Sequence, residues 1–177
     1  KGVTTITYTA TDSAGNTASS SMTVTITDNQ NPTVSAASNV AENLVTGCTK
    51  SITISNATYA DNCTLGATPL AWSMSGATTG SGTGQVGAYT FNKGVTTILY
   101  TVTDASSLTA TSSMTVTLSD RINPVISSAG SNKSANVIAT TCAASVTVDA
   151  VSFSDNCSGE VLSYTISGAT TASGSGQ

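Results

Sequence analysis

The chain has 177 residues, a net charge of −4 and only 8% charged residues. Five Lys and Arg residues do not form the cationic cluster that phosphate binding requires, so a nucleic-acid partner is excluded. No apolar run approaches the ~20 residues of a membrane helix, so this segment is not expected to span a membrane. Histidine is absent, which removes the commonest general base and most zinc ligands. The composition therefore argues against an enzyme.

An internal repeat is the strongest feature of the sequence. The segment KGVTTITYTATD at 1–12 returns as KGVTTILYTVTD at 93–104, an offset of 93 − 1 = 92. The cysteines return at 142 − 48 = 94, so one loop carries an insertion of two residues. Asn-Pro pairs end two strand patterns and divide the chain into three parts. These are 1–31, the C-terminal part of a first repeat; 32–122, a complete repeat; and 123–177, the N-terminal part of a third repeat.

Alternation of apolar and polar residues predicts strands throughout, and no stretch shows a helical period. Turns are predicted at 12–16 and 104–107. Ile6, Tyr8 and Ala10 are expected to share one face of their strand, as are Met22, Val24 and Ile26. In the complete repeat the inward-facing residues are expected to be, in chain order, Val34 and Ala36; Ile52 and Ile54; Leu70, Trp72 and Met74; Val86, Ala88 and Phe91; Ile98, Tyr100 and Val102; Met114, Val116 and Leu118. About seven strands per repeat predict an all-β fold of tandem immunoglobulin-like β-sandwich domains. We also expect the parent chain to continue past Gln177 with a segment like 86–92.

Trp72 aligns with Tyr164 in the next repeat and has two interpretations. An exposed aromatic side chain could stack against a carbohydrate. Trp72, however, is in phase with Leu70 and Met74 in the same predicted strand, so packing in the core is favoured.

The four cysteines recur with equal spacing. Cys48 and Cys63 are 15 residues apart, and so are Cys142 and Cys157. This pattern predicts one disulfide within each repeat, Cys48–Cys63 and Cys142–Cys157, each contributing roughly 3 kcal/mol. Buried free thiols are the alternative, while a zinc site would need more ligands. Disulfides would place the protein in an oxidising compartment outside the cell.

Acidic and amide residues recur at turns and at the repeat boundaries. Calcium takes oxygen ligands of this kind and stiffens the hinges of many extracellular modules. The alternative is that these residues only cap turns. The candidate calcium ligands are Asp28, Asp61, Asn62, Asp104, Asp120, Asp155 and Asn156. No other cofactor is expected.

Three ordered motifs resemble the hyalin repeat family: KGVTTIxYTxTD, SMTVT(I/L)xDxxNP and DNC. This resemblance implies immunoglobulin-like modules of extracellular adhesion proteins. Long Thr-rich arrays of this kind are similar to giant surface adhesins of Bacteroidota, which the type IX secretion system exports and some of which serve gliding motility. Ser13 lies in a sequence that resembles the O-glycosylation acceptor of these bacteria. The chain departs from the family in having serines at 19–21, where members often carry a further cysteine.

Together these features predict a repeated spacer or adhesive stalk in a long filament on the bacterial outer surface, with neighbouring repeats as its partners. A different interpretation is an accessory or carbohydrate-binding module of a secreted enzyme. A hydrolase is disfavoured because the nine carboxylates are scattered at repeat-equivalent positions rather than gathered in a pocket.

Overall fold

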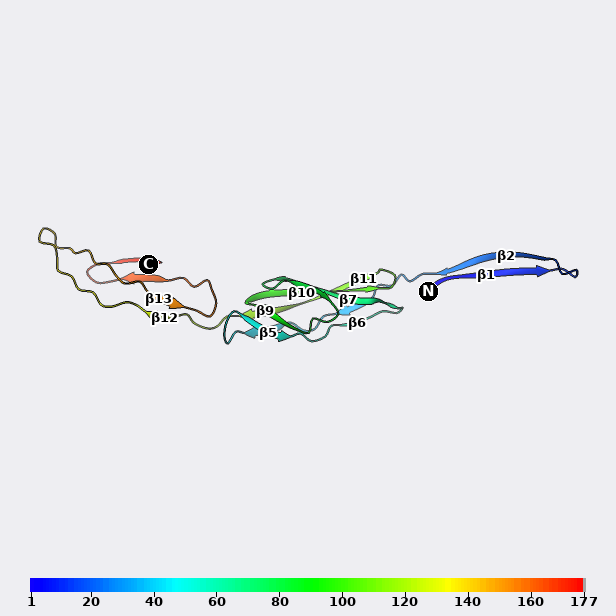
Figure 1. Cartoon of the computed structure of the whole chain (residues 1–177), viewed down its shortest axis with the longest axis horizontal. Helices are drawn as coiled ribbons and strands as arrows, with labels where there is room; N and C mark the ends of the chain where they lie inside the picture. The colour runs from blue at the N-terminus through cyan, green and yellow to red at the C-terminus, as the bar shows by residue number, and fades with distance from the viewer. Residues whose placement is uncertain (177) are drawn as a thin grey trace.

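The computed structural model describes residues 1–176, so the predicted continuation at Gln177 lies outside the described residues. The described residues contain no helix. No helix that could span a membrane is therefore present among them. The predicted all-β class is confirmed. Figure 1 shows the strands in three groups along the long axis of the molecule. The strands are β1 (Gly2–Thr11), β2 (Thr17–Ile26), β3 (Thr33–Ser35), β4 (Val40–Asn43), β5 (Thr49–Thr53), β6 (Thr58–Ala60), β7 (Leu65–Gly76), β8 (Gly80–Thr83), β9 (Ala88–Asn92), β10 (Gly94–Asp104), β11 (Thr109–Ser119), β12 (Val125–Ser128), β13 (Ser152–Ser154), β14 (Ser163–Ile166) and β15 (Ala172–Ser175).

The first group is the hairpin β1–β2, two antiparallel strands joined by the turn predicted at 12–16. Asp12 organises this turn. Its Oδ1 accepts hydrogen bonds from the backbone N–H groups of Ala14 at 2.9 Å and Asn16 at 2.8 Å, and its Oδ2 accepts one from the Asn16 side chain at 2.8 Å. Gly15 has φ +86°, a left-handed conformation that side chains disfavour, which explains the glycine.

The second group is the complete repeat. Its largest sheet has the strand order β4-β11-β10-β7-β8, in which β4 runs parallel to β11 and the other neighbours are antiparallel. Two smaller antiparallel pairs, β3–β6 and β5–β9, accompany it. A single core cluster of buried residues contains side chains of the large sheet, such as Leu70, Ile98 and Leu118, together with Phe91 of β9. It also contains Cys157, which belongs to the segment after the complete repeat. Apart from Cys157, the buried residues of this core all belong to the complete repeat.

Most predicted inward positions of the complete repeat are confirmed. All six on β10 and β11 are buried, as are Leu70, Met74, Ile54 and Phe91. Trp72 is half-buried, packs against the core cluster and meets the Tyr89 ring edge-on with centroids 5.8 Å apart, which confirms the core interpretation. Ala88 is exposed, so its predicted inward position is wrong. On β9 it is Tyr89 and Phe91 that face inward, and Ala88, one residue out of phase with them, faces outward.

The internal repeat recurs in the pairing of the strands. In β1–β2 the pair Ile6↔Met22 corresponds to Ile98↔Met114 in β10–β11, at an offset of 92. The third group repeats two further pairs: β12–β13 matches β3–β6, and β14–β15 matches β7–β8. Residues 1–31 and 123–176 therefore adopt local structures that the complete repeat also contains.

One aromatic-on-glycine contact shows how closely the copies agree. Trp72 on β7 lies opposite Gly82 on β8, and a Cβ atom at Gly82 would come within 2.6 Å of the indole ring. Tyr164 lies opposite Gly174 in the same way, and a Cβ atom at Gly174 would come within 2.6 Å of the Tyr164 hydroxyl oxygen and 2.8 Å of its ring. Only glycine leaves room for an aromatic ring to lie flat across its neighbour here.

Tyr100 offers a test of the core. Its side chain is 0% exposed, its hydroxyl is buried without a hydrogen-bond partner among the described residues, and burial raises the pKa of the phenol. An unpaired buried hydroxyl keeps its desolvation penalty. We expect Tyr100→Phe to raise the free energy of unfolding by about 1 kcal/mol in urea denaturation. Tyr8→Phe, at the equivalent but exposed position of β1, should change nothing. A destabilised Tyr100→Phe variant would contradict this account.

Candidate functional site at the repeat junctions

Three carboxylates meet at the first junction, where the β1–β2 hairpin joins the complete repeat. Asp28 follows β2, Asp61 follows β6, and Asp104 is the last residue of β10. One oxygen atom from each lies within 4.8 Å of the others. Residues far apart in the sequence are therefore gathered at the boundary between two repeats.

Each of these carboxylates is oriented by its own turn. One oxygen accepts a hydrogen bond from the backbone N–H two residues ahead: Gln30 for Asp28 at 3.2 Å, Cys63 for Asp61 at 2.9 Å and Ser106 for Asp104 at 2.7 Å. Such Asx turns fix the direction of the side chain. The other oxygens of Asp61 and Asp104, Oδ1 and Oδ2 respectively, are buried and have no hydrogen-bond partner among the described residues.

Lys1 supplies a positive charge beside this cluster. Its Nζ lies 3.7 Å from Asp28 Oδ2 and donates a hydrogen bond to the Ser106 hydroxyl. The pKa of Asp28 is lowered, first by the Gln30 N–H and further by the Cys63 thiol, Lys1 and Ser106, against an opposing effect of burial. Asp28 is thus held as a carboxylate. One ammonium group faces three carboxyl groups, so the charge of the cluster is not balanced by its protein neighbours.

Cys63 is a free, exposed cysteine at the same junction. Its thiol donates a hydrogen bond to Asp28, and this bond is the largest cause of its raised pKa; burial and the charges of Asp28 and Asp61 act in the same direction. A raised pKa leaves less thiolate at a given pH, and thiolate is the reactive form.

The reactivity of Cys63 should therefore depend on Asp28. In Asp28→Asn the acceptor charge is lost and the pKa of Cys63 falls, so more thiolate is present at mildly alkaline pH. We expect faster alkylation of Cys63 by iodoacetamide, by up to about tenfold for each unit of pKa, measured by mass spectrometry. Cys142, the other free cysteine, is an internal reference in the same sample. An unchanged rate at Cys63 would show that Asp28 does not control the thiol.

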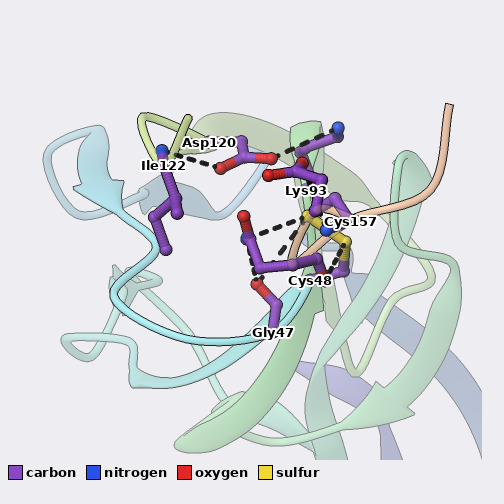
Figure 2. A network of polar contacts seen from close by, with 8 residues as sticks. Gly47, Cys48, Lys93, Asp120, Ile122 and Cys157 are labelled. Atoms are coloured by element: carbon purple, nitrogen blue, oxygen red, sulfur yellow. Dashed lines mark hydrogen bonds and ion pairs between the residues drawn. A yellow bond between two sulfur atoms is a disulfide. The ribbon is translucent and has the colours of Figure 1, made fainter. Parts of the chain in front are cut away.

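The second junction joins the complete repeat to residues 123–176 and repeats part of this arrangement, as Figure 2 shows. Asp120 Oδ1 accepts a hydrogen bond from the Ile122 N–H at 3.1 Å, and Lys93 Nζ lies 3.6 Å from Asp120 Oδ2. The pKa of Asp120 is lowered, first by the Ile122 N–H and further by Asn156 and Lys93. Lys93 and Asp120 correspond to Lys1 and Asp28 at an offset of 92. The lysine–aspartate pair is thus a repeated element of the junctions.

Asn156 and a disulfide hold the two sides of the second junction together. The Asn156 side-chain amide donates a hydrogen bond to the Gly47 carbonyl at 2.8 Å. Beside it, Cys48 and Cys157 form a disulfide that spans 109 residues of sequence, visible in Figure 2. Cys48 itself is held near Lys93, whose backbone N–H donates to the Cys48 carbonyl at 2.9 Å. The bond therefore links one repeat to the next.

The predicted pairing of cysteines within each repeat is wrong. Cys48 bonds to Cys157, while Cys63 and Cys142 are free. The reason lies in the course of the chain. Cys48 precedes β5 and lies at the second junction, whereas Cys63 follows β6 and lies at the first junction beside Asp28. Figure 1 shows β5 and β6 toward opposite ends of the complete repeat.

The candidate calcium ligands separate into two groups. The structure brings Asp28, Asp61 and Asp104 together at the first junction, while Asp120 and Asn156 meet at the second. Asp155 Oδ2 accepts a long, 3.4 Å hydrogen bond from the Cys157 N–H, and its Oδ1 is buried without a partner among the described residues. Asn62, next to Asp61 in the sequence, is exposed.

Two features of the junctions were missed by reasoning from the sequence. The lysines at positions 1 and 93 begin the repeated motif and could have been paired with the aspartates that recur at the same offset. The spacing of the cysteines was equally compatible with a disulfide between repeats, because such a bond would recur along the array with the same offset as a bond within each repeat. Ser13 lies exposed at the tip of the first hairpin.

No protein-family model matches the chain, and no curated protein matches it significantly.

Proposed function

We propose that this chain is a segment of a tandem array of immunoglobulin-like β-sandwich repeats that acts as a structural spacer or adhesive stalk in a long extracellular filament. The observation that carries the proposal is the Cys48–Cys157 disulfide, which ties one repeat to the next. A covalent bond between consecutive repeats serves a structure that must transmit force along its length. It has no evident use in a module that presents one binding surface.

The free cysteines fit the same array. Cys63 is the counterpart of Cys157, and Cys142 is the counterpart of Cys48, both at an offset of 94. Cys63 also lies at the first junction next to Asp28, whereas Cys157 lies at the second next to Asn156. On this proposal the two free cysteines are the halves of the next disulfides along the filament. Neighbouring repeats would then be joined by disulfide bonds and would also pack against one another.

Exposed apolar surface on residues 1–31 and 123–176 supports the proposal that each repeat packs against its neighbours in the chain. Side chains of the β1–β2 hairpin that are exposed, such as Ile6, Met22 and Val24, have counterparts in the core of the complete repeat. Residues 123–176 surround an apolar hollow of about 550 Å³ whose lining includes Ile126, Val148 and Ile166. Exposed apolar area of this kind favours burial against another segment. In a complete array these faces would close into sandwiches like the central one.

The resemblance to hyalin repeats supports a place on the bacterial outer surface, with export by a type IX secretion system and a role in adhesion or gliding. The alternative, an accessory or carbohydrate-binding module of a secreted enzyme, finds less support. Trp72, the side chain best suited to stack on a sugar, packs against the core and the Tyr89 ring.

Electron microscopy of the parent protein released from the cell surface tests this function. We expect thin filaments with a regular bead spacing, and a genetic deletion of one 92-residue unit should shorten the filament by one bead. Compact particles would overturn the proposal. Retention of the purified chain on insoluble polysaccharides, lost in Trp72→Ala, would favour the accessory module instead.

A further inference from the structure

We infer that Asp28, Asp61 and Asp104 form a calcium-binding site at the junction between two repeats. The three side chains each place an oxygen atom within 4.8 Å of the other two. Two oxygens bound to the same calcium ion, at about 2.3–2.6 Å each, are separated by at most about 5 Å. The cluster therefore has the dimensions of one calcium coordination sphere, with water completing the remaining positions.

The strongest observation is the state of Asp104. This residue is 4% exposed, and its Oδ1 already accepts hydrogen bonds from the Ser106 and Leu108 N–H groups at 2.7 and 2.8 Å. Its Oδ2 is buried and has no hydrogen-bond partner among the described residues. A buried carboxylate oxygen without a donor is costly unless a cation satisfies it. Asp61 Oδ1 is in the same condition.

A second copy of the Asp104 turn shows what a satisfied aspartate looks like. Asp12 occupies the equivalent turn, and there the Asn16 side chain donates to Asp12 Oδ2 at 2.8 Å. Leu108 replaces Asn16 in the complete repeat, and its side chain has no group that could donate to Asp104 Oδ2. The turn at Asp104 has therefore lost its internal donor at the same place where two other carboxylates converge.

Charge leads to the same conclusion. Three carboxyl groups carry up to three negative charges, and the cation that the structure places beside them is Lys1, 3.7 Å from Asp28 Oδ2. The remaining charge of about −2 matches a divalent ion. The cluster offers carboxylate oxygen and contains no histidine, which suits calcium better than zinc or copper.

A calcium ion here would join the end of one repeat to the body of the next. Asp28 belongs to the segment that follows β2, whereas Asp61 and Asp104 belong to the complete repeat. Binding would therefore restrict bending at the junction. The site does not depend on the proposed filament, since its residues are gathered within this chain.

Isothermal titration of the chelator-treated chain with CaCl2 tests the inference. We expect one site, and a loss of affinity of at least about tenfold in Asp61→Asn and in Asp104→Asn. The matched control is Asp12→Asn, which changes the equivalent aspartate of the first hairpin and should bind calcium normally. Substitution by asparagine keeps one oxygen for the turn and removes only the charged ligand.

Thermal melting separates a metal site from a purely structural role. Calcium should raise the melting temperature of the wild-type chain and of Asp12→Asn, but not that of Asp61→Asn or Asp104→Asn. In EDTA the two site variants should melt no lower than the wild type, because repulsion between carboxylates is relieved. The site would be overturned if the wild type did not bind calcium or if both variants bound it unaltered. It would also be overturned if both variants were less stable than the wild type in EDTA and calcium still raised their melting temperatures. None of these results would bear on the filament proposal.

Discussion

Cys48→Ser is expected to lower the stability of the second junction more than any other single change described for this chain. The bond between Cys48 and Cys157 closes a loop of 109 residues, and in the chain-entropy model a loop of about 100 residues stabilises the folded state by about 4.7 kcal/mol. Loss of this constraint leaves the Asn156–Gly47 hydrogen bond and nearby polar contacts to hold the two repeats. Urea denaturation should therefore show an earlier transition for residues 123–176 in the variant.

Matched controls are present in the chain itself. Cys63→Ser and Cys142→Ser each remove a free cysteine and should leave the urea transition within about 0.5 kcal/mol of the wild type. The Cys48→Ser, Cys157→Ser double variant should resemble Cys48→Ser, because both lack the same bond. Equal destabilisation by Cys63→Ser and Cys48→Ser would point to the pairing within the repeat.

Tryptic mapping without reduction distinguishes the two pairings directly. Cleavage after Lys1, Lys50, Lys93 and Lys133 places Cys48 in peptide 2–50, Cys63 in 51–93, and both Cys142 and Cys157 in 134–177. The observed bond predicts a linked pair of 2–50 with 134–177. A linked pair of 2–50 with 51–93 would contradict the structure at the junction.

The sequence was informative wherever a periodic pattern determined which face of a strand is buried. Ile98, Tyr100 and Val102 alternate with polar residues, and burial follows that alternation because the pleat of a strand has a period of two. Ala88 shows the limit of this reasoning. A short strand with apolar residues in both phases can face either way, and only the pairing of β9 with β5 decides it.

The junctions were less accessible to prediction because they depend on contacts between repeats. The sequence marks the acidic residues as candidate oxygen donors, yet it could not show that Asp28 lies beside Asp61 and Asp104. Asp61 and Asp104 lie 33 and 76 residues after Asp28 in the sequence, and a local sequence pattern cannot predict contacts over such separations. The disulfide pairing could not be predicted for the same reason, because the spacing of the cysteines is the same whether the bond lies within one repeat or between two.

The second large effect concerns the core, where Ile98→Ala should destabilise the complete repeat by about 2–5 kcal/mol. Ile98 is 0% exposed and lies at the centre of β10, opposite Met74 on one neighbouring strand and Met114 on the other. Truncation removes apolar contact and leaves a cavity that a sheet held on both sides cannot easily close.

The repeat provides an unusually close control for this variant. Ile6 is the counterpart of Ile98 in β1, has the same cross-strand partner type in Met22, and is 37% exposed. Ile6→Ala should cost less than about 1 kcal/mol in the same urea titration, because much of its surface is already in water and the surrounding side chains can relax. Since the two sites share residue type and strand register, the difference between the two losses of stability measures the effect of the strands that cover Ile98. An equal loss at both positions would mean that another surface buries the β1–β2 hairpin in solution.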